Sequence, residues 1–336
     1  MRTLLTALLV MSTTASAFEL KRDSAGEPAA WKSEVRFVVD AKLSKNLDVP
    51  GSEQAIAAAL KTVGDAIPTL KLTQSAGTPQ AMGYDFENPK ASASNVIAPA
   101  EWKYNVDAVA TTVITITRST HQIIEADIAF NVKHTAFAIV GATAESARFD
   151  VQNTMTHELG HALGLAHNDL PATVMYPSGK PGDVSKRALA DDDVKGLQYL
   201  YGAPAAVAPA PEEVARGCSA TGAAPIAMLA VLLVAVMRKK RAAMALAAVL
   251  GGFVFVGPSF ASTQLVKDAW TVTAVTTLPP GKGPTVLETD VTVIRDGIAH
   301  TVRVPGGRWG DIEQIVEGFA VPYAGDELAT FPRATP

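Results

Sequence analysis

A short stretch near the middle of the chain has the residue types and the spacing of a metal site. His157 and His161 stand at positions i and i+4, so on a helix both side chains project from one face and can bind one ion. Glu158 adjoins the first histidine, where its carboxylate can take a proton from a water molecule beside the metal. Gly164 permits the sharp turn that would bring His167 back as a third ligand. Three histidines with an open fourth position are typical of catalytic zinc.

The composition of the 336-residue chain limits what holds it together and what it binds. Its formal net charge of −4 gives no reason to expect a nucleic-acid partner. Cys218 is its single cysteine, so an internal disulfide and a metal–thiolate cluster are both excluded. Hydrophobic residues make up 48% and charged residues 18%, partly because several segments have the character of membrane-directed sequence. The folded parts must therefore be stabilised by ordinary cores and bound ions.

The elements that must position the histidine motif are strands and helices with clear sequence patterns. Alternating or β-rich segments predict strands at residues 34–40, 109–117 and 123–131, with an edge strand at 136–140. Ser52 is expected to cap a helix that runs to about residue 67, and residues 191–201 to form a last helix. The motif helix itself should begin between residues 149 and 154. We therefore expect an α+β fold, a twisted mixed sheet backed by helices that include the active-site helix.

Residues 152–202 also carry the features of a known family. Val174-Met175-Tyr176-Pro177 follows the histidine motif at the position of a Met-turn, and residues 189–202 resemble a characteristic closing helix. The segment 125–131 is similar to a sheet segment of bacterial members. Over roughly residues 30–202 the chain therefore resembles the matrixin-like metzincin zinc metallopeptidases.

This resemblance implies hydrolysis of peptide bonds in protein or peptide substrates. Zinc held by His157, His161 and His167 would lower the pKa of water towards neutrality and polarise the scissile carbonyl. Glu158 would act as the general base and pass the proton to the departing amine. One alternative is a non-catalytic surface-binding module that retains the metzincin fold, which an intact Glu158 disfavours. A zinc hydrolase for other substrates is the second alternative, which the Met-turn disfavours.

The resemblance also assigns roles around the histidines. Met175 would form an apolar floor beneath the zinc, although an ordinary core methionine is the simpler alternative. Tyr176 stands one residue too early to match the tyrosine ligand of some metzincins, so it and Pro177 are expected to border the pocket for the side chain after the cut. Residues 136–140 are a candidate for the edge strand that pairs with substrate.

Two departures from the family pattern affect regulation and metal content. No cysteine precedes the zinc motif, so latency cannot depend on a cysteine switch. The remaining histidines, His121, His134 and His300, lack the spacing of a second zinc site, and the first two are expected to be polar residues at strand ends. Calcium is compatible with the resemblance, but no loop motif indicates where it would bind.

The domain organisation follows from shifts in composition along the chain. A positive start, an apolar run and a small-residue cleavage pattern predict a signal peptide, so the protein is expected to be exported and extracellular or held at the cell surface. The predicted parts are residues 1–17 signal peptide, 18–202 peptidase domain, 203–217 Ala/Pro linker, 218–241 transmembrane or sorting segment, 242–261 second signal-like segment, and 262–336 small β module.

The segment after the linker admits two interpretations. Cys218, an apolar run and the basic cluster 238–241 resemble the C-terminal sorting signal of myxobacterial surface proteins, in which the cysteine marks processing and anchoring. Residues 242–261 nevertheless satisfy the pattern of a second signal peptide, and the hairpin turn at Asp296-Gly297 marks the β module that follows. We interpret the chain as two exported proteins in one reading frame. The alternative is a two-span membrane hairpin formed by residues 218–261.

Overall fold

The computed structural model describes most of the chain outside its predicted export and membrane segments. The described residues are 18–91, 93–99, 101–141, 147–202, 270–319, 321–324 and 326–328. They belong to one compact unit that unites the predicted peptidase domain with the C-terminal region. No helix in these ranges is long and apolar enough to cross a membrane. Cys218 and the predicted segments 1–17, 218–241 and 242–261 lie outside the described residues and stay predictions.

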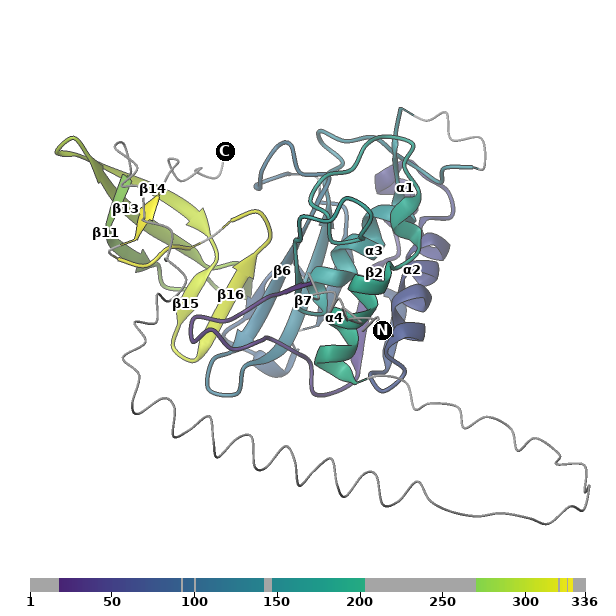
Figure 1. The fold of residues 1–336 in the computed structure, drawn as a ribbon, viewed down its shortest axis with the longest axis horizontal. Helices are drawn as coiled ribbons and strands as arrows, with labels where there is room; N and C mark the ends of the chain where they lie inside the picture. The colour runs from purple at the N-terminus through teal and green to yellow at the C-terminus, as the bar shows by residue number, and fades with distance from the viewer. Residues whose placement is uncertain are drawn as a thin grey trace, which may run out of the picture. The chain divides into compact units, whose positions relative to one another are not determined.

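A seven-stranded mixed sheet forms the centre of this unit (Figure 1). Its strand order is β15-β16-β6-β7-β5-β2-β3. Neighbours among β3, β2, β5 and β7 run parallel, whereas β6 and β16 are antiparallel to the strands beside them. The bounds are β2 Val35–Asp40, β3 Leu72–Gly77, β5 Ser94–Ile97, β6 Ala110–Thr117, β7 Gln122–Phe130, β15 Gly307–Trp309 and β16 Ile312–Val316. The mixed sheet predicted for an α+β peptidase is confirmed.

Helices cover one face of this sheet. The longest are α2 (Ser52–Ala66) and α3 (Val151–Ala162), which pack with the sheet into the main hydrophobic core (Figure 1). The others are α1 Leu43–Leu47, η1 Pro89–Ala91, η2 Ser185–Arg187 and α4 Asp191–Tyr201. The prediction that Ser52 caps α2 is wrong. Gly51, with φ at +85°, is the N-cap residue, and the Ser52 hydroxyl instead donates a 2.7 Å hydrogen bond to the carbonyl of Val49.

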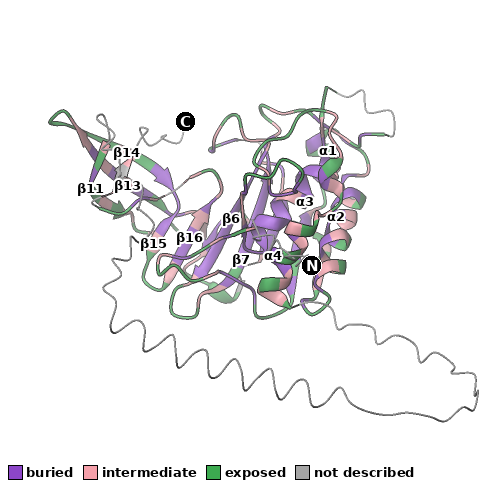
Figure 2. Ribbon diagram, viewed as in Figure 1, coloured by how far each residue is buried: buried purple, intermediate pink, exposed green. Residues whose placement is uncertain are grey.

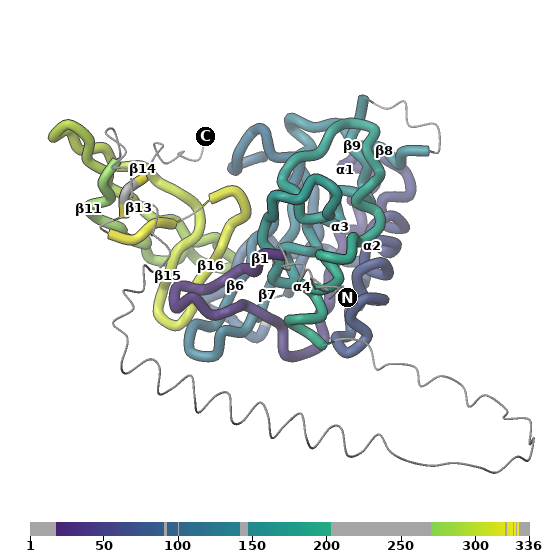
Figure 3. The backbone as a smooth tube through the Cα atoms, viewed as in Figure 1, coloured from purple at the N-terminus to yellow at the C-terminus, as the bar shows by residue number. Residues whose placement is uncertain are grey.

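Three short two-stranded sheets, each made of two-residue strands, lie outside the two larger sheets. They are β1 (Glu19–Leu20) with β10 (Leu165–Ala166), β4 (Tyr84–Asp85) with β12 (Pro284–Thr285), and β8 (Phe137–Ala138) with β9 (Phe149–Asp150), the last pair seen in Figure 3. Residues 136–140, predicted as an edge strand, therefore lie outside the seven-stranded sheet, because β8 pairs only with β9. The Val140 amide donates to Asp150 Oδ2 at 2.9 Å, and its carbonyl accepts from Arg187 Nη2 at 2.9 Å.

The C-terminal region is all β, in line with the sequence pattern, but part of it joins the central sheet. Its own four-stranded sheet has the order β14-β13-β11-β17, with β11 Trp270–Thr277, β13 Glu288–Arg295, β14 Ile298–Pro305 and β17 Glu327–Leu328. Asp296 and Gly297 have φ of +51° and +77°, as the predicted tight hairpin requires. The pairing of β16 with β6 was not predicted.

Both faces of β6 are covered, because its residues contribute to two separate apolar clusters, and nearly all of them are buried (Figure 2). On the face away from the main core, a second apolar cluster includes Trp102, Tyr104 and Val113. Val316 and the partly buried Phe319 of the C-terminal region belong to this cluster. The C-terminal region thus completes a core that the peptidase domain alone would leave open.

Candidate metal centre

The helix that carries the first two histidines begins and ends at defined caps. Asp150 is its N-cap, and its Oδ1 accepts a 2.8 Å hydrogen bond from the Asn153 amide. The chain reverses at Gly164, where φ is +94°. A Cβ at this position would lie 2.3 Å from the carbonyl oxygen of Ala29, so both the backbone angle and the close packing require glycine. The predicted role of Gly164 is confirmed.

The three predicted ligands converge on one point. His157 Nε2 lies 3.2 Å from His167 Nε2, and His161 Nε2 lies 3.1 Å from the same atom. Their potential ligand atoms lie within 4.8 Å of one another, and no second group of this kind occurs among the described residues. The three nitrogens therefore surround a space in which one ion can contact them all.

The opposite ring nitrogens hold these rings in place. His157 Nδ1 lies 2.6 Å from the carbonyl oxygen of Val174, and His161 Nδ1 lies 2.9 Å from that of Leu165. Because a carbonyl only accepts, each Nδ1 carries the proton, and each Nε2 presents its lone pair to the shared centre. Burial lowers the pKa of both histidines well below the ordinary value, which favours the neutral form that binds metal. This donor set fits zinc.

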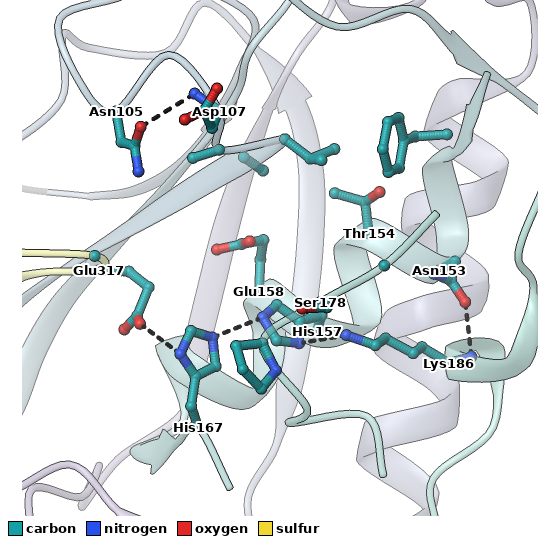
Figure 4. Close-up of a pocket in the computed structure, with 17 residues that line it drawn as sticks. Asn105, Asp107, Asn153, Thr154, His157, Glu158, His167, Ser178, Lys186 and Glu317 are labelled. Atoms are coloured by element: carbon teal, nitrogen blue, oxygen red, sulfur yellow. Dashed lines mark hydrogen bonds and ion pairs between the residues drawn. The ribbon is translucent and has the colours of Figure 1, made fainter. Parts of the chain in front are cut away.

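Glu158 lies beside the histidines without being one of the converging groups (Figure 4). Its carboxylate is buried between α3 and the sheet, and Oε2 accepts a 2.6 Å hydrogen bond from the Thr112 hydroxyl of β6. Burial raises the pKa of Glu158 to about 7, even though the Thr112 hydrogen bond acts in the opposite direction. A carboxyl group with a pKa near 7 is well suited to take up and release a proton at neutral pH.

Met175 packs directly beneath the motif helix. It is buried, and a Cβ added at Gly160 would lie 2.2 Å from its sulfur atom. Gly160 is therefore the residue that lets the methionine approach α3, a role that the sequence pattern alone does not indicate. The packing role expected for Met175 fits this arrangement.

Asp193 of α4 holds the turn that contains Met175. Its carboxylate accepts hydrogen bonds from the amides of Val174 at 2.9 Å, Met175 at 3.2 Å and Ala190 at 2.9 Å. Since Val174 also supplies the carbonyl that orients His157, Asp193 supports the metal centre through the turn.

Replacing Asp193 with alanine is expected to destabilise the fold by roughly 3–5 kcal/mol, because three amides lose their acceptor. Denaturant unfolding of the variant measures this loss. The matched control is Asp191→Ala, an exposed residue of the same helix turn, for which a change below about 1 kcal/mol is expected. Equal stability of the two variants would contradict the assigned role.

A cavity of about 390 Å³ opens beside Glu158 and the histidines (Figure 4). One side is the segment that leads into β6, and the opposite side is the chain after the Met-turn. Its lining residues include Asn105, Asp107, Ala110, Phe149, Thr154, Pro177, Ser178, Gly179, Lys186 and Gly318. The expectation that Pro177 borders a pocket agrees with this lining. Tyr176 instead directs its carbonyl to the Lys186 ammonium, which is 2.5 Å away.

The third histidine has a partner that sequence analysis missed. His167 Nδ1 lies 3.3 Å from Glu317 Oε1 (Figure 4). The other carboxylate oxygen lies 3.6 Å from His161 Nδ1. Lys21 pairs with the same carboxylate. Burial alone would raise the pKa of Glu317, but the positive charge of Lys21 and the neighbouring His167 lower it below the ordinary value. No motif marks Glu317, because only the pairing of β16 with β6 brings it to the centre.

The other histidines lie away from this centre. His121 Nδ1 contacts Asp23 Oδ2 at 2.5 Å, His134 is exposed in the loop after β7, and His300 lies against the Trp270 ring. Within the described ranges, the only group of three potential ligands is His157, His161 and His167. The same ranges show no group of three carboxylates for calcium.

The geometry of the motif agrees with a comparison against protein families. The matrixin family model matches residues 30–202, just over half of the chain. The chain belongs to the matrixin family. Matrixins are zinc-dependent and calcium-binding, so zinc is the ion expected at the three-histidine centre.

Individual matrixins match over short stretches of 47 to 60 residues. Human matrilysin is 53% identical over 47 residues, which are 14% of this chain and 18% of matrilysin. Metalloendoproteinase 2-MMP of Arabidopsis thaliana is 45% identical over 58 residues, 17% and 15% of the two chains. Human neutrophil collagenase is 40% identical over 60 residues, 18% and 13%. The chain thus spans less than a fifth of the length of these relatives.

Proposed function

We propose that this matrixin is an exported zinc endopeptidase that hydrolyses peptide bonds in protein or peptide substrates. The observation that carries the proposal is the convergence of three histidine Nε2 atoms beside the buried Glu158, with an open cavity next to them. Export rests on the predicted signal peptide 1–17. Anchoring through Cys218 and residues 218–261 is a further proposal from the sequence.

The roles of the chain's own residues follow from their contacts. Bound zinc supplies Lewis-acid chemistry, since it acidifies water and polarises a carbonyl. Glu158 takes the proton from the attacking water and delivers it to the departing amine, while Thr112 keeps its carboxylate in place. The cavity beside Pro177 and Thr154 accepts the side chain that follows the cleaved bond.

The alternative is a non-catalytic module that keeps the fold and metal and binds a surface partner. The two functions are separated by incubating the zinc-loaded full-length chain with an unfolded generic protein and identifying new N-termini by mass spectrometry. An endopeptidase generates new internal N-termini at a rate that depends on enzyme concentration. Intact substrate in the presence of a fully zinc-loaded chain, both as the wild type and with Val316→Asp to loosen the strand that lies along β6, would favour the binding module.

A further inference from the structure

The edge of the peptidase sheet nearest to the metal centre is occupied by the chain's own C-terminal region. β6 is the outer strand of the peptidase part of the sheet, and Thr112 within it contacts Glu158. β16 runs antiparallel along it, from Ile312 opposite Thr117 to Val316 opposite Val113. The pairing continues one residue further, because the Glu317 amide donates to the Thr112 carbonyl at 2.8 Å.

This docking is supported by specific side-chain contacts. Val316 is 1% exposed and packs with Trp102 and Val113 of the peptidase domain. The Gln314 amide group bridges the two parts, because its Nε2 lies 3.3 Å from the Thr115 hydroxyl and its Oε1 accepts from the Leu287 amide at 2.6 Å. These contacts are those of a packed, desolvated interface.

A second contact lies at the other end of the docked segment. β12 pairs with β4 of the peptidase domain, and Thr285 lies against Gly83. A Cβ at Gly83 would be only 2.2 Å from the Thr285 carbonyl carbon, so this glycine permits the close approach of the two backbones. Residues 284–319 are thus held at two separate places on the domain.

The docked strand ends at the metal centre. Glu317, the residue after β16, places its carboxylate between His167 and Lys21. The chain then turns at Gly318, where φ is +82°, and Gly318 lines the cavity. The segment therefore covers the approach along β6, while Glu317 and Gly318 border the cavity.

An extended peptide binds a sheet most readily by adding a strand to an exposed edge, where main-chain hydrogen bonds supply affinity. Two strands cannot pair with the same edge of β6 at once. Resting on the proposed peptidase function, we propose that residues 284–319 are an inhibitory segment that occupies the peptide-binding edge of β6. A peptide reaches the metal centre along β6 only after this segment has left. The segment blocks β6 in the same way whether it stays joined to the peptidase domain or is cut from it and remains bound as a separate chain.

The test uses Val316→Asp in the full-length chain. A buried, unpaired carboxylate costs several kcal/mol, so the variant is expected to release β16 from β6. The matched control is Ile298→Asp, an exposed hydrophobic residue on β14 of the same region. Hydrogen exchange of residues 113–117 reports release, and faster exchange is expected in Val316→Asp alone.

Two zinc-directed probes then measure access to the edge without any hydrolysis. A tripeptide with a C-terminal hydroxamate would lie along β6 in the direction of β16, whereas acetohydroxamate needs no strand edge. Val316→Asp should bind the tripeptide hydroxamate at least about ten-fold more tightly relative to acetohydroxamate, whose affinity reports any effect of moving Glu317 away from His167. Unchanged affinity for the tripeptide in a variant with an exposed β6 would overturn the proposal.

The wild-type chain supplies an independent check. Saturating tripeptide hydroxamate should accelerate hydrogen exchange of residues 312–316, because peptide and strand compete for one edge. If these amides stay protected while the probe is bound, the inhibitory role is refuted. If the probe displaces β16 but the chain cleaves no substrate, the competition for β6 is supported. Only the proposed endopeptidase function is then excluded.

Discussion

Replacing Glu158 with glutamine is expected to slow peptide-bond hydrolysis by about 10²–10⁴-fold, the range typical of a lost general base. The amide matches the carboxylate in size and can still accept the hydrogen bond from Thr112, so the packing between α3 and β6 is retained. It cannot take a proton from water. Because Glu158 is not among the converging ligands, the zinc content of the variant should equal that of the wild type.

Initial rates on an unfolded protein substrate, with zinc measured on the same samples, test this expectation. Glu87→Gln is the matched control, since Glu87 is exposed and its side chain lies outside the metal centre. Running the comparison also in the Val316→Asp background removes any contribution of the docked segment. A Glu158→Gln rate within a few fold of the wild type would exclude this residue as the base.

Replacing His161 with alanine is expected to weaken zinc binding by more than about 100-fold. Loss of a residue that hydrogen-bonds to a metal ligand already lowers metal affinity by about 10–100-fold. Loss of a ligand itself should lower the affinity further. His161 is 1% exposed, and its Nε2 lies 3.1 Å from His167 Nε2, within the group that would hold the ion. Activity at limiting zinc should fall in parallel.

Competition with a chelating fluorophore gives the affinity of each variant. His134→Ala is the control, because this histidine is exposed and lies away from the cluster. Zinc affinity equal to that of the wild type in His161→Ala would show that the ion binds elsewhere.

The parts of this site that the sequence predicts are those encoded locally. The i, i+4 spacing of His157 and His161 places both on one helix face, and the +94° φ of Gly164 is what the expected return of His167 requires. The Asp296-Gly297 turn is likewise a two-residue signal, which depends only on residues that tolerate positive φ. Such patterns need no knowledge of the rest of the fold.

The parts that were missed depend on contacts between distant segments. Glu317 reaches His167 because β16 pairs with β6, and strand pairing has no local code that names the partner strand. Gly160 is explained only by the sulfur of Met175 beneath it, and Asp193 only by the three amides that it binds. For the same reason, residues 262–336 were predicted as an independent β module, although β15 and β16 belong to the central sheet.

The most direct measurement for the central claim is a zinc titration of the metal-free Val316→Asp chain, in which β6 is expected to be exposed, followed by the appearance of new N-termini in an unfolded protein substrate. Activity should be absent in the stripped chain, rise linearly with added zinc and level off at one zinc per chain, as a single three-histidine centre requires. Full activity in the stripped chain, or activity that does not depend on added zinc, would contradict the assignment of a zinc endopeptidase.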